Sequence, residues 1–468
     1  MHIHWHRRDL RWRDNRGLAA ATDGDDSVVP VFVLDPTVLE HASPIRVACL
    51  LEALESLRGW YRERGSDLVV AHGESSAVIP DLADRYDAAD VTWNEDYSGL
   101  AQDRDRAVVA ALEDDGVEYE TVHDAICHEP GSITTNEGSH YSVFTYFWKK
   151  WRDREKAAAV DSPPATALAD VSGDPLPTLS DLGFEEPTAA VPTVTPEAAR
   201  KRAETFCLEE GTIYRYADER DCPAADATSR LSTDLKYGTL GIRELYALTE
   251  QTWEDATSDA DRESVDTFRQ QLAWREFYAH VLAFNPSVVS TNFSDYQNEI
   301  EWNDDPAELE AWRAGETGYP IVDAGMRQLL AEGWVHNRVR MIVASFLTKD
   351  LLIDWRAGYD WYRRHLVDHD TANDTGGWQW AASTGTDAQP YFRIFNPMTQ
   401  GEKYDPDAEY ITRHVPELQG VPPEDIHAWN DLPNERRREL APEYPDPIVD
   451  HGERRERALE MFKRARGE

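Results

Sequence analysis

A stretch towards the C-terminal end of the chain brings together residue types that could do chemistry. Residues 368–400 begin with three closely spaced acids, Asp368, Asp370 and Asp374, followed by a Gly-Gly pair at 376–377, two tryptophans and the run Pro-Tyr-Phe-Arg-Ile-Phe. The acids of an ordinary helix surface follow the helical period, and adjacent glycines and large aromatic side chains do not come directly after them. This composition predicts a segment that lines a cavity.

Metal binding is another use of paired carboxylates. No histidine or third acid stands at a fitting helical spacing from Asp368 and Asp370, so we expect no metal site. The four cysteines are scattered and form no Cys-x-x-Cys pair, which argues against zinc and is typical of a reduced compartment.

A second polar cluster reads TSRLS. It supplies hydroxyls, backbone amides and a guanidinium at a predicted helix start, a combination that can bind a pyrophosphate. An ordinary helix N-cap would explain it as well. The upstream segment YADERD adds Tyr216 and Arg220. The cluster consists of Thr228, Ser229, Arg230, Leu231 and Ser232.

The predicted helix at 262–284 has two faces. One is apolar, while Gln271, Trp274, Arg275 and Tyr278 fall at i, i+3, i+4 and i+7 on another stripe. A tryptophan between polar groups also occurs in a snorkelling surface patch, so the pattern alone leaves both explanations open.

The predicted helix at 335–354 repeats this arrangement. Beside an apolar stripe, Asn337, Arg338 and Met341 cluster on a second face. Methionine is usually core filler, and the spacing does not distinguish that role from a place in a binding pocket.

These segments together resemble the DNA photolyase and cryptochrome family. The run GGWQWAASTGTDAQPYFRIFNP at 376–397 matches the family almost without gaps, which is far more specific than a short motif. The resemblance extends to WHRRDLRWRDN at 5–15, to TSRLS, to WREFY at 274–278 and to the tract 318–355. It is weak at 155–200 and at the C-terminal end.

The resemblance implies a flavoprotein that binds FAD and UV-damaged DNA. It places Tyr216, Thr228, Ser229, Arg230, Leu231, Ser232, Phe268, Arg275, Asn337, Arg340, Asp368, Asp370 and Asp374 at the FAD. It places Arg220, Gln271, Trp274, Tyr278, Asn337, Arg338, Met341, Trp380 and Gln400 at the DNA lesion, with Lys403 in the same basic patch. It identifies Trp302, Trp355 and Trp378 as an electron relay, for which simple packing is the alternative.

Four positions depart from the family pattern. Gln271 stands where photolyases of cyclobutane dimers commonly have Glu. Asp374 occupies the position that faces flavin N5, where many photolyases have Asn and plant cryptochromes have Asp. Leu100 and Ala101 replace the Asn-Glu of folate-binding members. That replacement favours 8-hydroxy-5-deazaflavin over methenyltetrahydrofolate as the second, antenna chromophore.

The elements that must position these residues divide into an α/β part and an α part. Helical stretches at 46–64, 77–86 and 102–114 alternate with strands predicted at 3–6, 28–34, 67–72, 90–93 and 117–122. This alternation predicts a doubly wound parallel sheet, although no GxGxxG follows the first strand.

From about residue 200 the apolar period becomes helical. Helices are predicted at 199–210, 242–252, 262–284, 320–331, 335–354 and 360–365. We therefore predict a Rossmann-like antenna domain at 1–130, an interdomain linker at 131–200 and a helical FAD-binding domain at 201–468.

The charge is strongly acidic. Eighty-eight acids against 48 bases give a net charge of −40, and only eight of the bases are lysine. This composition is typical of a protein from a salt-loving cytoplasm, where exposed charges are screened within a few ångströms. It argues against generic binding of nucleic acid, but a local basic patch remains compatible with DNA.

No signal-peptide core and no apolar run long enough to cross a membrane occurs in the sequence. We therefore expect a cytoplasmic monomer with no membrane and no obligate protein partner. The resemblance implies light-driven repair of cyclobutane pyrimidine dimers, and Asn337, Arg338 and Met341 favour this lesion, because six-four photolyases have histidines in that region. The alternative is a cryptochrome-type photoreceptor without repair. An unrelated flavoenzyme would need a nucleotide fingerprint that the sequence lacks.

Overall fold

The five predicted strands form one parallel sheet. In this computed structural model, which describes residues 1–24 and 26–468, the strand order is β3-β2-β1-β4-β5. The strands are β1 (His2–His6), β2 (Val28–Leu34), β3 (Val69–His72), β4 (Asp90–Asn94) and β5 (Glu118–Val122). The predicted doubly wound sheet is confirmed.

Burial along the strands explains why they could be predicted. All seven residues of β2 are buried, as expected of a strand covered on both faces in a parallel sheet. β5 lies at an edge, and four of its residues are exposed, two of them glutamates. Charge on an edge strand discourages pairing with another chain.

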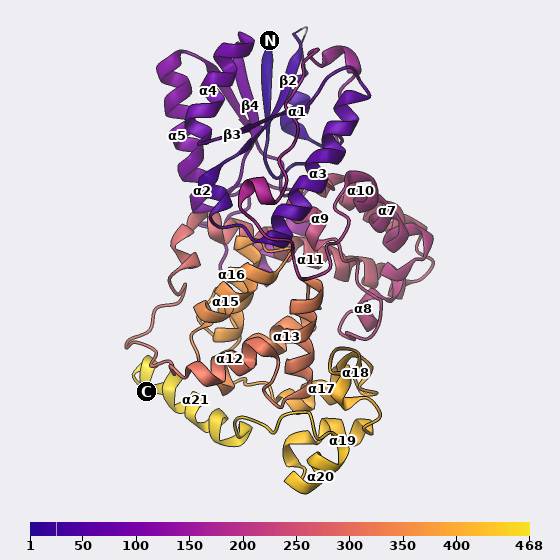
Figure 1. Cartoon of the computed structure of the whole chain (residues 1–468), viewed down its shortest axis with the longest axis vertical. Coiled ribbons are helices and arrows are strands. Elements are labelled where there is room, and N and C mark those ends of the chain that lie inside the picture. Colours follow the sequence, from indigo (N-terminus) through magenta and orange to yellow (C-terminus); the bar gives the residue numbers. More distant parts are fainter. Residues whose placement is uncertain (25) are drawn as a thin grey trace. The chain divides into compact units, whose positions relative to one another are not determined.

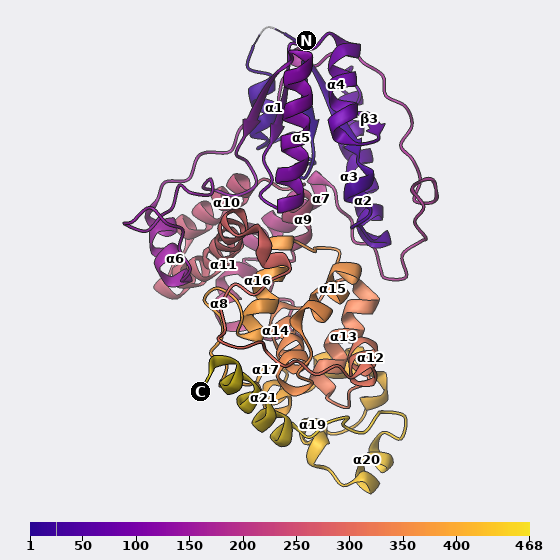
Figure 2. The same cartoon turned by 90° about the vertical axis from the view of Figure 1, so that its left-hand side faces the viewer.

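Helices connect the strands of this sheet (Figure 1). They are α1 (Arg16–Ala21), α2 (Pro36–Leu39), α3 (Pro44–Arg62), α4 (Ser75–Tyr86) and α5 (Gly99–Asp115). Figure 2 shows α4 and α5 side by side, and they pack against each other.

Beyond the sheet the regular elements of the chain are helices, while residues 154–195 are largely irregular, with 3-10 turns at Ala165–Ala167 and Ser180–Leu182. Its first helices are α6 (Phe144–Asp153), α7 (Pro196–Glu204), α8 (Tyr216–Glu219), α9 (Ser232–Tyr237), α10 (Ile242–Asp255) and α11 (Asp259–Phe284). Its later helices are α12 (Pro306–Ala314), α13 (Pro320–Glu332), α14 (Asn337–Ser345), α15 (Trp355–His365), α16 (Thr371–Ala382), α17 (Pro397–Tyr404), α18 (Glu409–His414), α19 (Pro423–His427), α20 (Asn434–Leu440) and α21 (His451–Arg466).

Three helix predictions differ from the structure. The helix expected at 199–210 is α7 followed by a π-helical turn at Thr205–Glu209. The single helix expected at 335–354 is α14 followed by a π-helical turn at Phe346–Asp350, because an apolar period does not reveal a change of hydrogen-bond register. The glycine-rich segment at 371–382 is the helix α16, although its composition did not predict one.

The described residues divide into two compact units. Unit 1 comprises Met1–Pro187, Val191–Ala217 and Thr228–Ser287 and contains the sheet. Unit 2 comprises Thr188–Ala190, Asp218–Ala227 and Val288–Glu468, and its core is apolar and aromatic. The predicted domain boundaries at 130 and 200 remain predictions.

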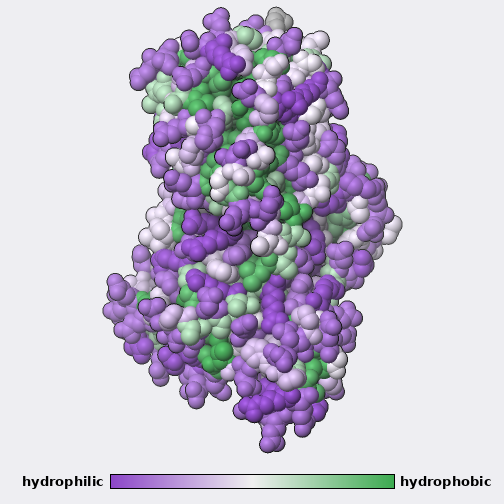
Figure 3. Space-filling model, in the orientation of Figure 1, coloured by the Kyte–Doolittle hydropathy of each residue, from purple (hydrophilic) through white to green (hydrophobic). Residues whose placement is uncertain are grey.

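Hydrophilic residues predominate on the face drawn in Figure 3. Within the part of the chain that the structure describes, no helix is long and apolar enough to span a membrane.

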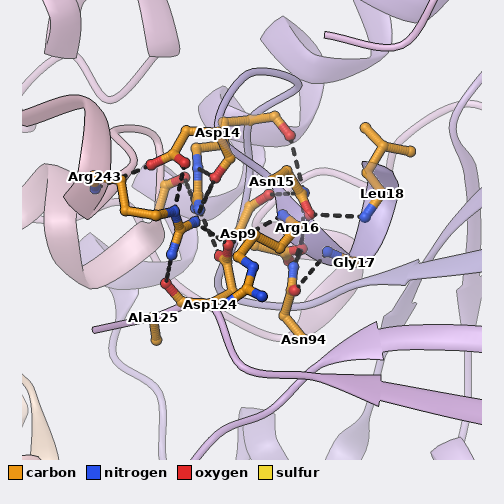
Figure 4. Close-up of polar contacts among 12 residues, drawn as sticks. Asp9, Asp14, Asn15, Arg16, Gly17, Leu18, Asn94, Asp124, Ala125 and Arg243 are labelled. Atoms are coloured by element: carbon orange, nitrogen blue, oxygen red, sulfur yellow. Dashed lines mark hydrogen bonds and ion pairs between the residues drawn. The ribbon is translucent and has the colours of Figure 1, made fainter. Parts of the chain in front are cut away.

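A buried ion network joins α10 to the loop after β1 in unit 1 (Figure 4). Arg243 donates from Nε to Asp14 Oδ1 at 2.7 Å and from Nη1 to the carbonyl oxygen of Asp124 at 3.0 Å. Arg11 forms a second ion pair with Asp124. The carboxylate of Asp14 also accepts the backbone N–H of Arg243 at 3.1 Å, in the first turn of α10, where the helix dipole favours an anion.

Replacing Arg243 with methionine is expected to lower the free energy of unfolding by about 3–5 kcal/mol, because two aspartates would stay buried with one cation fewer. The loss should persist in multimolar KCl, since salt screens buried pairs much less than exposed ones. Urea denaturation measures it.

The matched control is Arg106→Gln, which removes an exposed pair with Asp103. Exposed pairs contribute little, so this variant should unfold almost like the parent protein. Equal losses in the two variants would contradict the role assigned to the buried network.

Candidate functional site

The guanidinium of Arg340 in unit 2 holds two of the acids singled out in the sequence. Arg340 lies on α14 and donates from Nε to the carbonyl oxygen of Val335 at 2.8 Å, which fixes its stem. Its Nη2 donates to Asp368 Oδ2 at 2.7 Å, and its Nη1 lies 3.8 Å from Asp374 Oδ1. One arginine therefore ties α14 to the start of α16.

The start of α16 positions the remaining acid. Asp370 is the N-cap, and its Oδ1 accepts the N–H of Asn373 at 3.1 Å. Asp374 lies in the first turn, where the positive end of the helix dipole stabilises a carboxylate. Asp374 Oδ2 is 2.6 Å from Nδ1 of His369, a partner that the sequence did not predict.

Burial and charge work against each other at this cluster. Burial disfavours the charge of Arg340, but Asp368 and Asp374 outweigh it and raise the pKa of the guanidinium above its ordinary value. Burial, with the charge of Asp374 next in importance, raises the pKa of Tyr359 to about 12. The arginine stays charged and the tyrosine stays neutral at ordinary pH.

One atom of this cluster lacks a protein partner. Asp368 Oδ1 is buried, and among the described residues nothing donates a hydrogen bond to it. A buried acceptor of this kind is normally satisfied by a bound group or by water. The site fits a ligand that offers an N–H or O–H group, as a flavin ring or a ribose does.

Aromatic rings surround the predicted FAD residues of unit 1. Tyr216 meets Phe268 edge-on at 5.4 Å, and Phe206 packs against Phe268 at 4.9 Å. All three are buried.

The TSRLS cluster lies at the start of α9. Leu231 is the N-cap residue and its own side chain makes no capping hydrogen bond, while the hydroxyl of Ser229 accepts the N–H of Leu231 at 3.4 Å. The N-cap alternative therefore stays open. Arg230 has a φ of 50°. This left-handed conformation is uncommon for a residue with a Cβ and occurs mainly at turns and functional sites.

The stripe on α11 is used in two ways. Arg275 donates to the carbonyl oxygens of Ala125 at 2.9 Å and Leu235 at 3.1 Å, so part of its guanidinium holds the backbone of unit 1. Gln271 donates to the carbonyl oxygen of Thr267 at 3.1 Å.

Trp274 is half-buried and stacks on Phe144 of α6 at 3.7 Å, with 10° between the rings. Tyr278 lies 5.5 Å from the same indole. Phe144 fixes one face of the indole, so Trp274 is held in place by more than its own helix.

In unit 2, basic side chains gather on one aromatic ring. The guanidinium of Arg338 lies 4.4 Å from the ring centre of Tyr404, and the ammonium of Lys403 lies 4.8 Å from it. Arg338 also pairs with Asp221 at 2.7 Å, on the segment that contains Arg220.

The other predicted lesion residues of unit 2 are Asn337, Met341, Trp380 and Gln400. Asn337 Nδ2 is 3.9 Å from Met341 Sδ on α14. Trp380 of α16 lies 6.5 Å from Phe395, and Gln400 is a half-buried residue of α17.

The three relay candidates lie in unit 2, each with its own neighbours. Trp355 is fully buried and donates to Asn292 Oδ1 at 2.9 Å, while Trp302 packs on Phe462 at 6.0 Å. Trp378 lies 5.0 Å from Tyr362. No direct ring pair between any two of the three tryptophans is found among the described residues, so the relay remains a prediction.

Comparisons with known proteins cover the whole chain. Residues 2–167 match the family model described as DNA photolyase, and residues 268–464 match the model described as the FAD binding domain of DNA photolyase. The deoxyribodipyrimidine photo-lyase of Halobacterium salinarum is 60% identical, with 100% of both chains covered.

This chain belongs to the DNA photolyase family. The deoxyribodipyrimidine photo-lyase of a Synechococcus species is 41% identical over 98% of this chain and 96% of its own. Among solved structures, a class III photolyase from Agrobacterium tumefaciens has a TM-score of 0.91 at 36% identity and covers 100% of this chain and 98% of its own. A cryptochrome from Synechocystis has a TM-score of 0.89 at 25% identity, with 98% of each chain covered. The family resemblance of the sequence is confirmed.

The photolyase resemblance missed three features near the predicted site residues. His369 lies between two predicted acids but was not predicted as a partner, because its contact depends on the loop before α16. Phe144 is distant in sequence from Trp274, and no local pattern links them. Glu276 adjoins Arg275 but is buried, where it accepts the N–H groups of Cys127 and His128, and burial raises its pKa to about 7.

A buried group of potential metal ligands, His4, His6 and Asp9, also went unnoticed in the sequence. His4 Nε2 lies 3.3 Å from Asp9 Oδ2. That oxygen already accepts the side-chain amides of Asn94 at 2.6 Å and Asn15 at 2.9 Å (Figure 4). Its lone pairs are therefore used by the two amides. Neither ring nitrogen of the buried His4 has a hydrogen-bond partner among the described residues.

The ring of Trp378 leaves no room for a Cβ atom at Gly358 of α15. A Cβ at Gly358 would lie 2.1 Å from Cη2 of Trp378. Gly358→Ala should therefore lower the free energy of unfolding by about 1–3 kcal/mol through overpacking. Urea denaturation measures this loss.

Gly377→Ala on α16 is the control, because a Cβ there meets nothing within 4 Å. Alanine is about 1 kcal/mol better than glycine inside a helix, so this variant should be at least as stable as the parent. A stable Gly358→Ala protein would contradict the packing described.

Proposed function

We propose that this chain repairs cyclobutane pyrimidine dimers in DNA with bound FAD and light, as a carbon–carbon lyase. The observation that carries the proposal is the 60% identity over the full length to a deoxyribodipyrimidine photo-lyase. The matching FAD-domain model and the residue types at the predicted site support it.

The FAD residues proposed are those named from the sequence. In unit 2 they include Arg340, Asp368 and Asp374, where the unpaired Asp368 Oδ1 offers an acceptor to the cofactor. In unit 1 they include Tyr216, Phe268 and the TSRLS segment. When bound, FAD supplies the light-driven electron transfer, while the protein supplies position and electrostatics.

The predicted lesion residues would recognise the damaged bases. Trp274, held by Phe144, offers an aromatic surface to an extruded base, and stacking of this kind contributes roughly 1–3 kcal/mol per base. That offsets much of the few kcal/mol that flipping costs. The amide of Gln271 can hydrogen-bond a base, and Met341 supplies an apolar contact.

DNA would be held by a small basic patch. Arg220, Arg338 and Lys403 belong to one unit, and two of them flank Tyr404. A few positive side chains in a protein with net charge −40 favour a local contact over broad attraction to the phosphate backbone.

For the antenna we propose 8-hydroxy-5-deazaflavin. Leu100 is 41% exposed and Ala101 is buried, and neither side chain can donate or accept a hydrogen bond as the Asn-Glu pair of the folate-binding relatives does. Trp302, Trp355 and Trp378 are proposed to pass electrons towards the FAD. The protein would act as a monomer in the cytoplasm, where its four free cysteines stay reduced.

A photoreceptor without repair is the second candidate. It is favoured by Asp374 and Gln271, and by the likeness to a cryptochrome structure. Retention of Trp274, Met341 and Trp380 at the predicted lesion positions favours repair instead.

Dimer loss in light decides between the two. The protein, loaded with FAD and reduced without oxygen in multimolar KCl, is mixed with UV-irradiated DNA and either illuminated with blue light or kept dark. We expect thymine dimers to disappear in light alone. The action spectrum would show an added band if a deazaflavin is bound.

Trp274→Ala is the control variant, with loss of repair expected at unchanged FAD content. Full FAD occupancy without loss of dimers in the parent protein would exclude repair and favour the photoreceptor.

A further inference from the structure

His369 is hydrogen-bonded to Asp374. It lies in the loop before α16, is 9% exposed, and its Nδ1 lies 2.6 Å from Asp374 Oδ2. Its ring packs edge-on against Tyr359 of α15 at 5.6 Å. The loop therefore turns the imidazole back onto the first turn of the helix that follows it.

Other titratable groups surround the pair of His369 and Asp374. Arg340 on α14 faces the second oxygen of Asp374 at 3.8 Å, and it pairs with Asp368 at 2.7 Å. On α15, burial raises the pKa of Tyr359 and Tyr362, so both rings are neutral. Asp370 faces the N-terminus of α16, where it accepts two N–H groups of Asn373.

This arrangement fixes how many protons the pair holds. The charges of Arg340 and Asp368 cancel. The buried cluster is therefore neutral only when one proton is added to the pair formed by a neutral His369 imidazole and an Asp374 carboxylate. An unbalanced charge would be costly at this depth. Arg340 and the N-terminus of α16 both stabilise the carboxylate form of Asp374, which leaves the proton on the imidazole.

We propose that His369 is a positioning residue that holds this proton at Nδ1 and keeps Asp374 a carboxylate. The inference rests on the proposed function, in which Asp374 belongs to the FAD site. Asp374 then offers that site a negative charge and a hydrogen-bond acceptor, where an asparagine would offer neither charge nor a fixed acceptor. His369 would thereby set the charge next to the cofactor without touching it.

Infrared spectroscopy of the FAD-loaded protein tests this directly, because a protonated carboxyl has its own carbonyl stretch. At neutral pH the parent and Asp374→Asn should show no difference in that band. His369→Leu should gain the band, and the double variant with Asp374→Asn should lose it again.

Two further variants separate proton holding from simple hydrogen bonding. His369→Asn can donate to Asp374 but cannot carry the proton, so it should gain the band as His369→Leu does; a parent-like spectrum would overturn the proposal. His365→Leu removes a histidine of α15 whose ring lies 4.2 Å from that of Trp361 at a tilt of 45°, and it should leave the spectrum unchanged.

If the His369 variants fail to fold, nitrogen-15 spectra of the histidines in the parent protein give the answer without those variants. Assignment follows from the parent spectrum by comparison with the resonance that responds to Asp374→Asn. His369 protonated at both ring nitrogens is expected. A neutral His369 beside a protonated Asp374 would overturn the proposal. Absence of FAD binding would instead contradict the proposed function, which FAD content measures separately.

Discussion

Pairs of arginine and aspartate with little solvent exposure hold the predicted FAD site of unit 2 and the loop after the first strand of unit 1. In unit 2, Arg340 joins α14 to the acids at the start of α16. In unit 1, Arg243 joins α10 to the loop after the first strand. Burying charges is costly unless each finds a partner with good geometry, so these contacts define the arrangement strictly.

This constraint suits the acidic surface. A net charge of −40 implies strong mutual repulsion, which a concentrated salt solution screens over a few ångströms. The same salt weakens every exposed ion pair, but it reaches the buried ones much less. Functional contacts are therefore expected where solvent is excluded, in buried ion pairs and in aromatic stacks such as Trp274 on Phe144.

The sheet could be predicted because buried parallel strands are short runs of apolar residues that can be recognised in the sequence. β2 is an unbroken apolar run, and its predicted bounds agree with the structure. The family of the chain could be predicted from the long run after α16 begins. The site residues could be named from the same match, but not how they are used, because a match shows residue types and not contacts.

Some contacts in the structure could not be predicted from the sequence. The pairing of His369 with Asp374 depends on a loop conformation, and that of Phe144 with Trp274 joins distant helices. The π-helical turn after α14 changes the hydrogen-bond register while the apolar period continues, so a periodic pattern cannot reveal it. Arg275 matched a flavin contact by family, yet part of its guanidinium holds backbone carbonyls.

We propose that this protein recognises damaged DNA through buried and stacked contacts and a few basic side chains. Affinity for a duplex with a single thymine dimer, measured against KCl concentration beside an undamaged duplex, tests it most directly. If Arg220, Arg338 and Lys403 each contact one phosphate, the logarithm of the binding constant should fall with the logarithm of the KCl concentration with a slope of about −3. The preference for the damaged duplex should persist at high salt. A slope of about −6 or steeper, with the preference lost in concentrated KCl, would contradict the account.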